Sequence, residues 1–268
     1  GPWFSTITSI CNLLINVPSN PKGYCKQKDA TEKGEISSMI VSTDPPYYDN
    51  IGYADLSDFF YVWLRRSLKS IYPDIFSTVL VPKTTELIAT PYRHKSKQDA
   101  EQFFMDGMTK AIHNLAENGS SDYPATIYYA FKQAEIKETG LTSTGWATFL
   151  EAVIRSGYSI NGTWPVRTER AARSVSLGTN ALASSVVLVC RKRSDEAPIA
   201  TRREFISELQ EKLPDDLKTL QESNIAPVDM AQSAIGPGIG IYSKYSKVVG
   251  ADGKRVSVGD ALAIINEE

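Results

Sequence analysis

Ser38-Met39-Ile40-Val41-Ser42-Thr43, followed directly by Asp44-Pro45-Pro46-Tyr47, is the most informative stretch of this 268-residue chain. The first six residues form a short apolar run that predicts a buried strand over 38–43. The Pro-Pro pair stiffens the loop that follows. Ligands of open α/β sheets bind at the carboxyl ends of strands, and we therefore expect this loop to be a functional site.

Helix and strand patterns alternate on the carboxyl side of this loop. Expected helices cover residues 56–72, 100–117 and 145–156, and expected strands cover residues 125–131, 158–166 and 184–191. This alternation predicts an α/β fold with a largely parallel sheet covered by helices. A short helix is also expected over residues 4–15. The aromatic residues of the helix after the loop are interpreted as its packed core, namely Phe59, Phe60, Tyr61 and Trp63.

The composition changes near residue 193, where a polar linker begins. We therefore divide the chain into residues 1–193 and a small C-terminal α+β extension, residues 194–268. The extension is expected to contain a helix over 202–212, a hairpin over 243–258 that turns at Asp252-Gly253, and a last helix from Asp260. The Gly-rich string Ile235 to Gly240 follows no strand and has no acidic residue ahead of it, so we interpret it as a turn.

Charge and metal-ligand content exclude several classes of protein. The chain has 29 Lys and Arg against 31 Asp and Glu, so any contact with nucleic acid must come from a local basic patch. Three cysteines and two histidines, with no Cys-x-x-Cys, indicate that no metal site should be expected. An odd and sparse set of cysteines fits a reducing cytoplasm.

The ends of the chain and its apolar runs predict a cytoplasmic protein. The apolar runs are too short to span a bilayer, so we expect no membrane partner. The first residues lack the basic region and the cleavage site of a secretory signal. The sequence starts with Gly1-Pro2 rather than Met, and we expect a soluble piece of a longer protein.

The loop also carries a resemblance to a known family. Asp44-Pro45-Pro46-Tyr47 matches the amine-methylating motif of S-adenosylmethionine-dependent DNA methyltransferases. The wider string resembles a subfamily of large adenine-specific DNA methylases associated with anti-phage defence, over Asp44 to Asn50, Tyr53 to Leu64, Gly178 to Ser185 and Gly236 to Gly238. The similarity extends from about Asp29 onward. It implies a Rossmann-like class I methyltransferase fold and methylation of the exocyclic N6 amine of adenine in DNA.

The chemistry of the motif agrees with this resemblance. The amine of adenine is a poor nucleophile because its lone pair is delocalised into the ring. The Asp44 carboxylate and the Pro45 carbonyl can accept its two hydrogens, and Tyr47 offers a face on which an extruded base can stack. Catalysis would then rest on positioning and charge placement around these residues and Pro46.

Other interpretations of the motif remain open. The loop lacks the nucleophilic cysteine that cytosine C5 methylation requires. Cytosine N4 or a protein amide remains a possible acceptor. A rigid surface turn whose Asp makes a local hydrogen bond is the structural alternative.

The remaining candidate residues come from the resemblance and from local charge. The resemblance implies that Asp29 and Ala30 contact the adenine of the cofactor. It also implies that Asp44 lies beside the cofactor. The alternative for Asp29 is an exposed loop aspartate with no ligand. Lys132 ends the next strand on the expected target-base side. Phosphate contacts are expected from Arg167, Arg170 and Arg173. The alternative is that these arginines lie in a solvated loop and bind no phosphate.

A Gly-rich cofactor loop is missing ahead of the motif. Only 43 residues precede Asp44, which is too short for three strands and their crossovers at about 30 residues per βαβ unit. We therefore expect the second half of the fold, a mixed sheet with an antiparallel last strand and an incomplete S-adenosylmethionine site. The missing half would come from an N-terminal segment or a partner chain, and homo-oligomerisation is another way to cover the open sheet edge. The alternative function is a non-catalytic nucleic-acid or protein interaction module of a defence complex.

Overall fold

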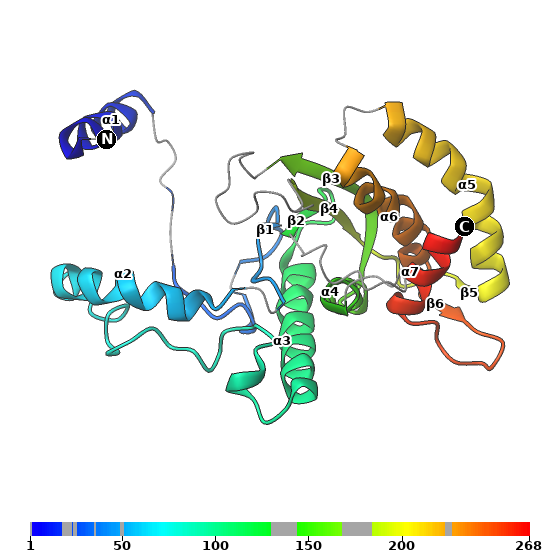
Figure 1. Ribbon diagram of the computed structural model, residues 1–268, viewed down its shortest axis with the longest axis horizontal. Helices are drawn as coiled ribbons and strands as arrows, with labels where there is room; N and C mark the ends of the chain where they lie inside the picture. The colour runs from blue at the N-terminus through cyan, green and yellow to red at the C-terminus, as the bar shows by residue number, and fades with distance from the viewer. Residues whose placement is uncertain are drawn as a thin grey trace.

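The chain is a mixed α/β protein in the computed structural model (Figure 1). The structure describes residues 2–17, 23, 26–34, 36–48, 51–129, 144–167, 184–222 and 227–268. Its elements are α1 (Trp3–Asn16), β1 (Ser42–Thr43), α2 (Tyr53–Leu68), η1 (Pro91–Arg93), α3 (Lys97–Asn118), β2 (Ala125–Tyr129), α4 (Thr144–Arg155), β3 (Tyr158–Arg167), β4 (Ser184–Lys192), β5 (Ile199–Thr201), α5 (Arg202–Glu222), α6 (Pro227–Lys244), β6 (Lys247–Val249) and α7 (Val258–Glu267).

The main sheet has four strands in the order β1-β2-β4-β3. β1 runs parallel to β2, whereas β4 is antiparallel to both β2 and β3. The expected mixed sheet with an antiparallel last strand is therefore confirmed. The expectation of a largely parallel sheet is wrong, because only one of the three strand pairs described in this sheet is parallel. A second, two-stranded sheet pairs β5 with β6 in parallel in the C-terminal part of the chain.

β1 is shorter than the predicted strand over 38–43. Only Ser42 and Thr43 pair with β2. Ser38 has a left-handed backbone with φ 58°, so a strand cannot start there. Met39 instead forms hydrogen bonds with the C-terminal end of α3 and the residues that follow it. Its N–H donates to the Asn118 carbonyl, and its own carbonyl accepts the Ser120 N–H. The first part of the segment is thus used to anchor α3.

The two faces of the main sheet differ in burial. Residues directly opposite one another on paired strands share a face. Ile127, Leu188 and Thr163 form one such row and are buried. The next row belongs to the other face, where Tyr128 is 36% and Trp164 is 64% exposed, while Val187 between them is buried. Within the described residues, this second face of the sheet is therefore covered only in part.

α3 covers the buried side and follows the predicted pattern closely. The Ser96 side chain caps its first turn by accepting the Asp99 N–H. A stripe at intervals of four residues is buried, comprising Ala100, Phe104, Met108 and Ile112.

α2 departs from the prediction that its aromatic residues form a core. Tyr61 is buried, but Phe59 is 69%, Phe60 is 64% and Trp63 is 60% exposed. The helix is packed by the segment before α3 along one narrow stripe, which holds Ala54 and Tyr61. Its other faces are uncovered within the described residues, and Figure 1 shows α2 extending away from the sheet.

α6 overturns the interpretation of Ile235 to Gly240 as a turn, because the string lies inside the helix. A Pro flanked by glycines ordinarily favours a turn. Here the glycines allow close packing: a Cβ on Gly236 would stand 1.7 Å from Thr163 Oγ1 on β3. The Ser243 hydroxyl also accepts the Ile160 N–H at 2.8 Å, so α6 is held against the edge strand of the sheet.

The predicted hairpin over 243–258 is confirmed only near its turn, where Val249 and Arg255 form an antiparallel bridge. Its bounds are wrong, because α6 continues to Lys244 and β6 pairs in parallel with β5. The turn itself is present, because the Gly250 N–H donates to Lys254 and Gly253 has φ 75°. α7 then begins with a capping box between Ser257 and Asp260.

No described helix combines the length and apolar character needed to cross a membrane.

Replacing Gly236 with Ala should destabilise the fold by about 1–3 kcal/mol, the usual cost of overpacking. The added methyl group would collide with a β-branched side chain on β3. Urea unfolding would measure the change. Gly259→Ala in α7 is the matched control, since its nearest neighbour would lie 3.7 Å away. Equal stability of the two variants would contradict the close packing of α6 on β3.

Candidate functional site

The loop Asp44 to Tyr47 directly follows β1, at the carboxyl edge of the parallel pair β1 and β2. Asp44 is exposed, whereas Pro45, Pro46 and Tyr47 are half-buried. The loop thus presents a solvent-accessible carboxylate on a partly embedded support. This is the position expected for ligand chemistry in an α/β sheet.

One tyrosine hydroxyl and one backbone amide hold the backbone at the end of the loop. Pro45 and Pro46 have no N–H, so the first amide donors after Asp44 belong to Tyr47 and Tyr48. The Tyr48 N–H donates to Tyr129 Oη at 3.0 Å. A second bond joins the Ala89 N–H to the Tyr48 carbonyl at 2.6 Å.

An aromatic cluster supports the Tyr47 ring. Its edge-on neighbours are Tyr129, with ring centroids 5.3 Å apart, and Tyr53, at 6.4 Å. Tyr129 lies at the end of β2 and stacks on Phe149 of α4 at 3.9 Å. Since Phe149 is fully buried, the cluster connects the exposed loop to the core.

The two phenols nearest the loop share a common electrostatic environment. Burial is the main cause that raises the pKa of Tyr47, and the Asp44 carboxylate raises it further against an opposing hydrogen bond with Ser185. Burial is also the main cause that raises the pKa of Tyr53; the nearby Tyr47 amide lowers this pKa, and the Asp44 and Glu86 carboxylates raise it. Both hydroxyls therefore stay protonated at neutral pH and lie within the field of Asp44.

A charged clamp, defined here as Asp55, Glu86 and Arg93, fixes the start of α2. The Ala54 N–H donates to Glu86 Oε1 at 2.9 Å. Arg93 bonds Glu86 Oε2 and Asp55 Oδ2, both at 2.5 Å. The guanidinium and the Glu86 carboxylate are largely buried, so water screens this pair little.

Asp29 and Ala30 form a turn against α3. The Asp29 carboxylate accepts from the Thr31 N–H and hydroxyl, both at 2.8 Å, and these bonds lower the pKa of Asp29. The Asn114 side chain donates to the Ala30 carbonyl at 3.1 Å. A pocket of about 350 Å³ opens beside the turn and is lined by Asp29, Phe103 and Lys110 among others. The contacts of this turn thus lead to α3 rather than to the Asp44 loop.

The expected phosphate-binding residues are not brought together by the described part of the structure. Arg167 is the last residue of β3 and pairs with Ser184 of β4. Lys132, Arg170 and Arg173 lie outside the described residues. Their grouping stays a prediction.

Sequence reasoning overlooked Tyr53, Tyr129 and the clamp. The position of Tyr129 could have been predicted, because it ends the strand next to β1 and the ends of neighbouring parallel strands meet at one edge of a sheet. The sequence gives a weaker indication for Tyr53, which is the first helical residue after the loop. The clamp brings together positions up to 38 residues apart and had no local signal.

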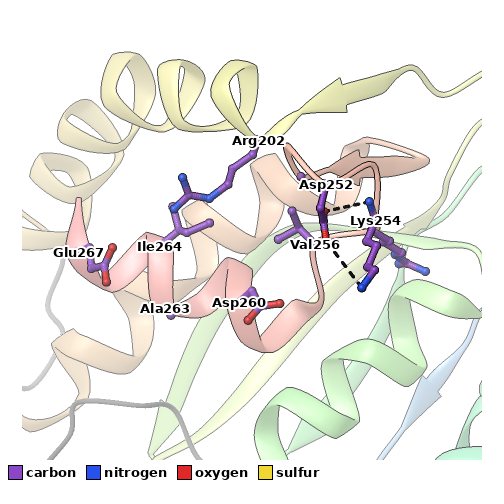
Figure 2. A pocket seen from close by; sticks show the side chains of 10 residues that line it. Arg202, Asp252, Lys254, Val256, Asp260, Ala263, Ile264 and Glu267 are labelled. Carbon is purple, nitrogen blue, oxygen red and sulfur yellow. Dashed lines mark hydrogen bonds and ion pairs between the residues drawn. The ribbon is translucent and has the colours of Figure 1, made fainter.

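The other cavities are less suited to chemistry. Figure 2 shows a pocket of about 440 Å³ between the start of α5 and α7. Its basic and acidic side chains balance, and Lys254 is paired with Asp252.

Among the residues that the structure describes, no group of three His, Cys, Asp or Glu is arranged to hold a metal ion.

Comparison with known proteins finds no matching family model, no matching curated protein and no matching solved structure.

Replacing Asp55 with Asn should lower stability at neutral pH, and this loss should shrink in acid. Hydrogen bonds from Tyr92 and then Arg93 lower the pKa of Asp55 in the folded protein. The stability from this carboxylate is therefore complete above its ordinary pKa of about 4 and is lost as pH falls through the lower folded value. Urea unfolding at pH 7, 5 and 3 would measure the trend.

Asp122→Asn is the control for this series, because Asp122 is exposed and lies outside the clamp. A loss at Asp55 that is equally large at pH 3 and pH 7 would show that its carboxylate charge does not stabilise the fold.

Proposed function

We propose that this chain carries the amine-binding part of an S-adenosylmethionine-dependent methyltransferase that acts on the N6 amine of adenine in DNA. One observation carries the proposal: an exposed Asp44 carboxylate stands on a rigid Pro-Pro loop at the carboxyl end of a parallel strand, beside the half-buried Tyr47. The motif resemblance supports the choice of adenine over other amines.

The chain's own residues suit the handling of an aromatic amine. Asp44 can accept one amine hydrogen and take up the proton that the nitrogen loses. The Pro45 carbonyl can accept the other hydrogen, and the Tyr47 face can stack on the base. When bound, S-adenosylmethionine would supply a sulfonium methyl group, which the amine nitrogen takes up as the carbon–sulfur bond breaks.

The sheet supports the view that a cofactor-binding half is supplied by other residues. The order β1-β2-β4-β3, with antiparallel β4, is the order expected for the fourth, fifth, seventh and sixth strands of a class I methyltransferase. β1 is an edge strand, and Ile40 beside it is exposed. A parallel strand added at this edge would bring its own carboxyl end next to Asp44. Covering helices on the partly exposed face would bury Trp164 and Tyr128.

The described residues fit the cofactor only in part. They offer the acceptor side at Asp44, while Asp29 is held in a turn against α3. The one Gly-rich string, Ile235 to Gly240, is inside α6 and packs on β3. We therefore assign the missing Gly-rich loop to an N-terminal segment or a partner chain, and DNA contacts to the arginines that follow β3.

Asp44→Asn should reduce kcat for methyl transfer by about 10²-fold or more, the usual cost of losing a catalytic proton acceptor. The assay follows transfer from labelled S-adenosylmethionine to DNA, with mass spectrometry of the nucleosides to identify N6-methyladenine. It is run on this chain and on the longest natural polypeptide that contains it. Asp122→Asn is the matched control.

Activity that survives Asp44→Asn would contradict the proposal. Salt-sensitive DNA binding with neither cofactor binding nor methyl transfer would instead support the non-catalytic interaction module.

A further inference from the structure

We infer that Tyr129 is a positioning residue for the proposed methyl transfer, because its hydroxyl accepts the Tyr48 N–H and its ring supports Tyr47. This inference rests on the proposed function and adds to it a residue that lies outside the motif, on β2. Three features of the structure carry it: the contacts of Tyr129 with the loop, the packing that fixes its ring, and a second bond that holds Tyr48.

Tyr129 contacts the two residues at the end of the loop in different ways. Its Oη lies 3.0 Å from the Tyr48 amide nitrogen and accepts the amide hydrogen. Its ring meets the Tyr47 ring edge to face, with centroids 5.3 Å apart and an angle of 68° between their planes. One side chain therefore restrains both the backbone that follows Tyr47 and the ring on which the target base would stack.

The packing around Tyr129 leaves its ring little freedom to move. Only 1% of the residue is exposed. Its ring stacks on Phe149 with centroids 3.9 Å apart and planes 10° from parallel, and the Trp146 ring lies 5.6 Å away. Both neighbours belong to α4 and are buried. Apolar packing thus holds the Tyr129 hydroxyl at a fixed point beside the loop.

A phenol hydroxyl at this depth needs a hydrogen-bond partner. The ring contacts alone would be met equally well by phenylalanine, and a buried hydroxyl without a partner costs free energy. The Tyr48 N–H is buried with the hydroxyl and provides a partner. The two residues are 81 positions apart, so only the fold brings them together. We therefore interpret the hydroxyl as a contribution to the loop rather than to β2.

The Tyr48 carbonyl is held independently of Tyr129. It accepts the Ala89 N–H at 2.6 Å. Tyr48 is thus bonded through both its N–H and its carbonyl, and its ring packs edge to face on Phe104 with centroids 5.1 Å apart. Between Asp44 and Tyr48 the chain contains two prolines, whose φ angles are fixed. A backbone anchored at Tyr48 therefore limits the directions in which the Asp44 carboxylate can point.

Tyr129→Phe tests the inference, because it removes the hydroxyl and keeps the ring. The Thr126 N–H donates to the Val41 carbonyl, so its exchange reports the opening of the sheet between β1 and β2. We expect amide hydrogen exchange at Tyr48 to accelerate about tenfold more than exchange at Thr126, the effect of losing one net hydrogen bond. NMR of the full chain resolves both amides.

The same variant should lower kcat for methyl transfer about tenfold, because a misaligned carboxylate slows the chemical step rather than binding. KM for DNA and for S-adenosylmethionine should stay unchanged, since the Tyr47 ring and its aromatic support remain. The assay uses the longest natural polypeptide that contains this chain.

Tyr242→Phe is the matched control. Tyr242 is also buried, and its hydroxyl donates to the Val256 carbonyl at 2.7 Å, in the C-terminal part of the chain. This variant likewise removes one buried hydroxyl and its bond to the backbone, but it should leave kcat unchanged and should not accelerate exchange at Tyr48 beyond that at Thr126. An equal fall of kcat in both variants would show that Tyr129 acts through stability alone and would overturn the inference.

Failure of the inference differs from failure of the proposed function. If exchange at Tyr48 rises no more than exchange at Thr126 in Tyr129→Phe, the inference is wrong, whatever the activity. Faster exchange at Tyr48 with unchanged kcat also overturns it, because the bond then does not position the loop. Absence of methyl transfer by the wild-type polypeptide overturns the proposed function and the role of Tyr129 in the reaction, while the exchange data still decide whether Tyr129 holds the Tyr48 backbone.

Discussion

One hydrogen bond from a backbone amide to a tyrosine hydroxyl governs the region around Asp44. Pro45 and Pro46 deprive the loop of donors, so its backbone must be fixed by the amides that follow. Tyr129 from β2 accepts the Tyr48 amide, and Tyr53 from α2 meets the Tyr47 ring edge to face. The loop is thereby joined to the sheet on one side and to α2 on the other. An exposed carboxylate can keep a fixed direction only if its backbone is held in this way.

Much of the surrounding architecture serves these two tyrosines. Tyr129 keeps its place because β2 lies between β1 and β4, and because Phe149 stacks on its ring. Tyr53 keeps its place through a carboxylate and a guanidinium from the segment before α3. The core contributes rigidity through apolar packing, whereas the clamp contributes it through charge. Acid should therefore loosen the α2 side, because the clamp depends on ionised carboxylates.

The sequence was most informative where a single periodicity controls the structure. The strands at Ala125, Tyr158 and Ser184 begin where their patterns begin, and α3 follows its apolar stripe. Prediction failed where distant contacts override a local rule. The Gly-Pro-Gly of α6 resembles a turn, but Gly236 lets the helix approach Thr163 on β3, and Gly238 lets it approach Ile265 on α7. Phe59 and Trp63 resemble a core, but no described element covers them. The Asp44 motif was visible in the sequence, whereas its tyrosine anchors required the fold.

The exposed part of the second sheet face has a consequence for how such a chain could be produced and studied. Trp164 and Tyr128 stand on a surface that is usually covered in α/β proteins, and within the described residues the edge at β1 is unpaired. The proposed function assigns the covering of this surface to another polypeptide segment. The solubility of the chain when it is expressed by itself should then depend on that segment.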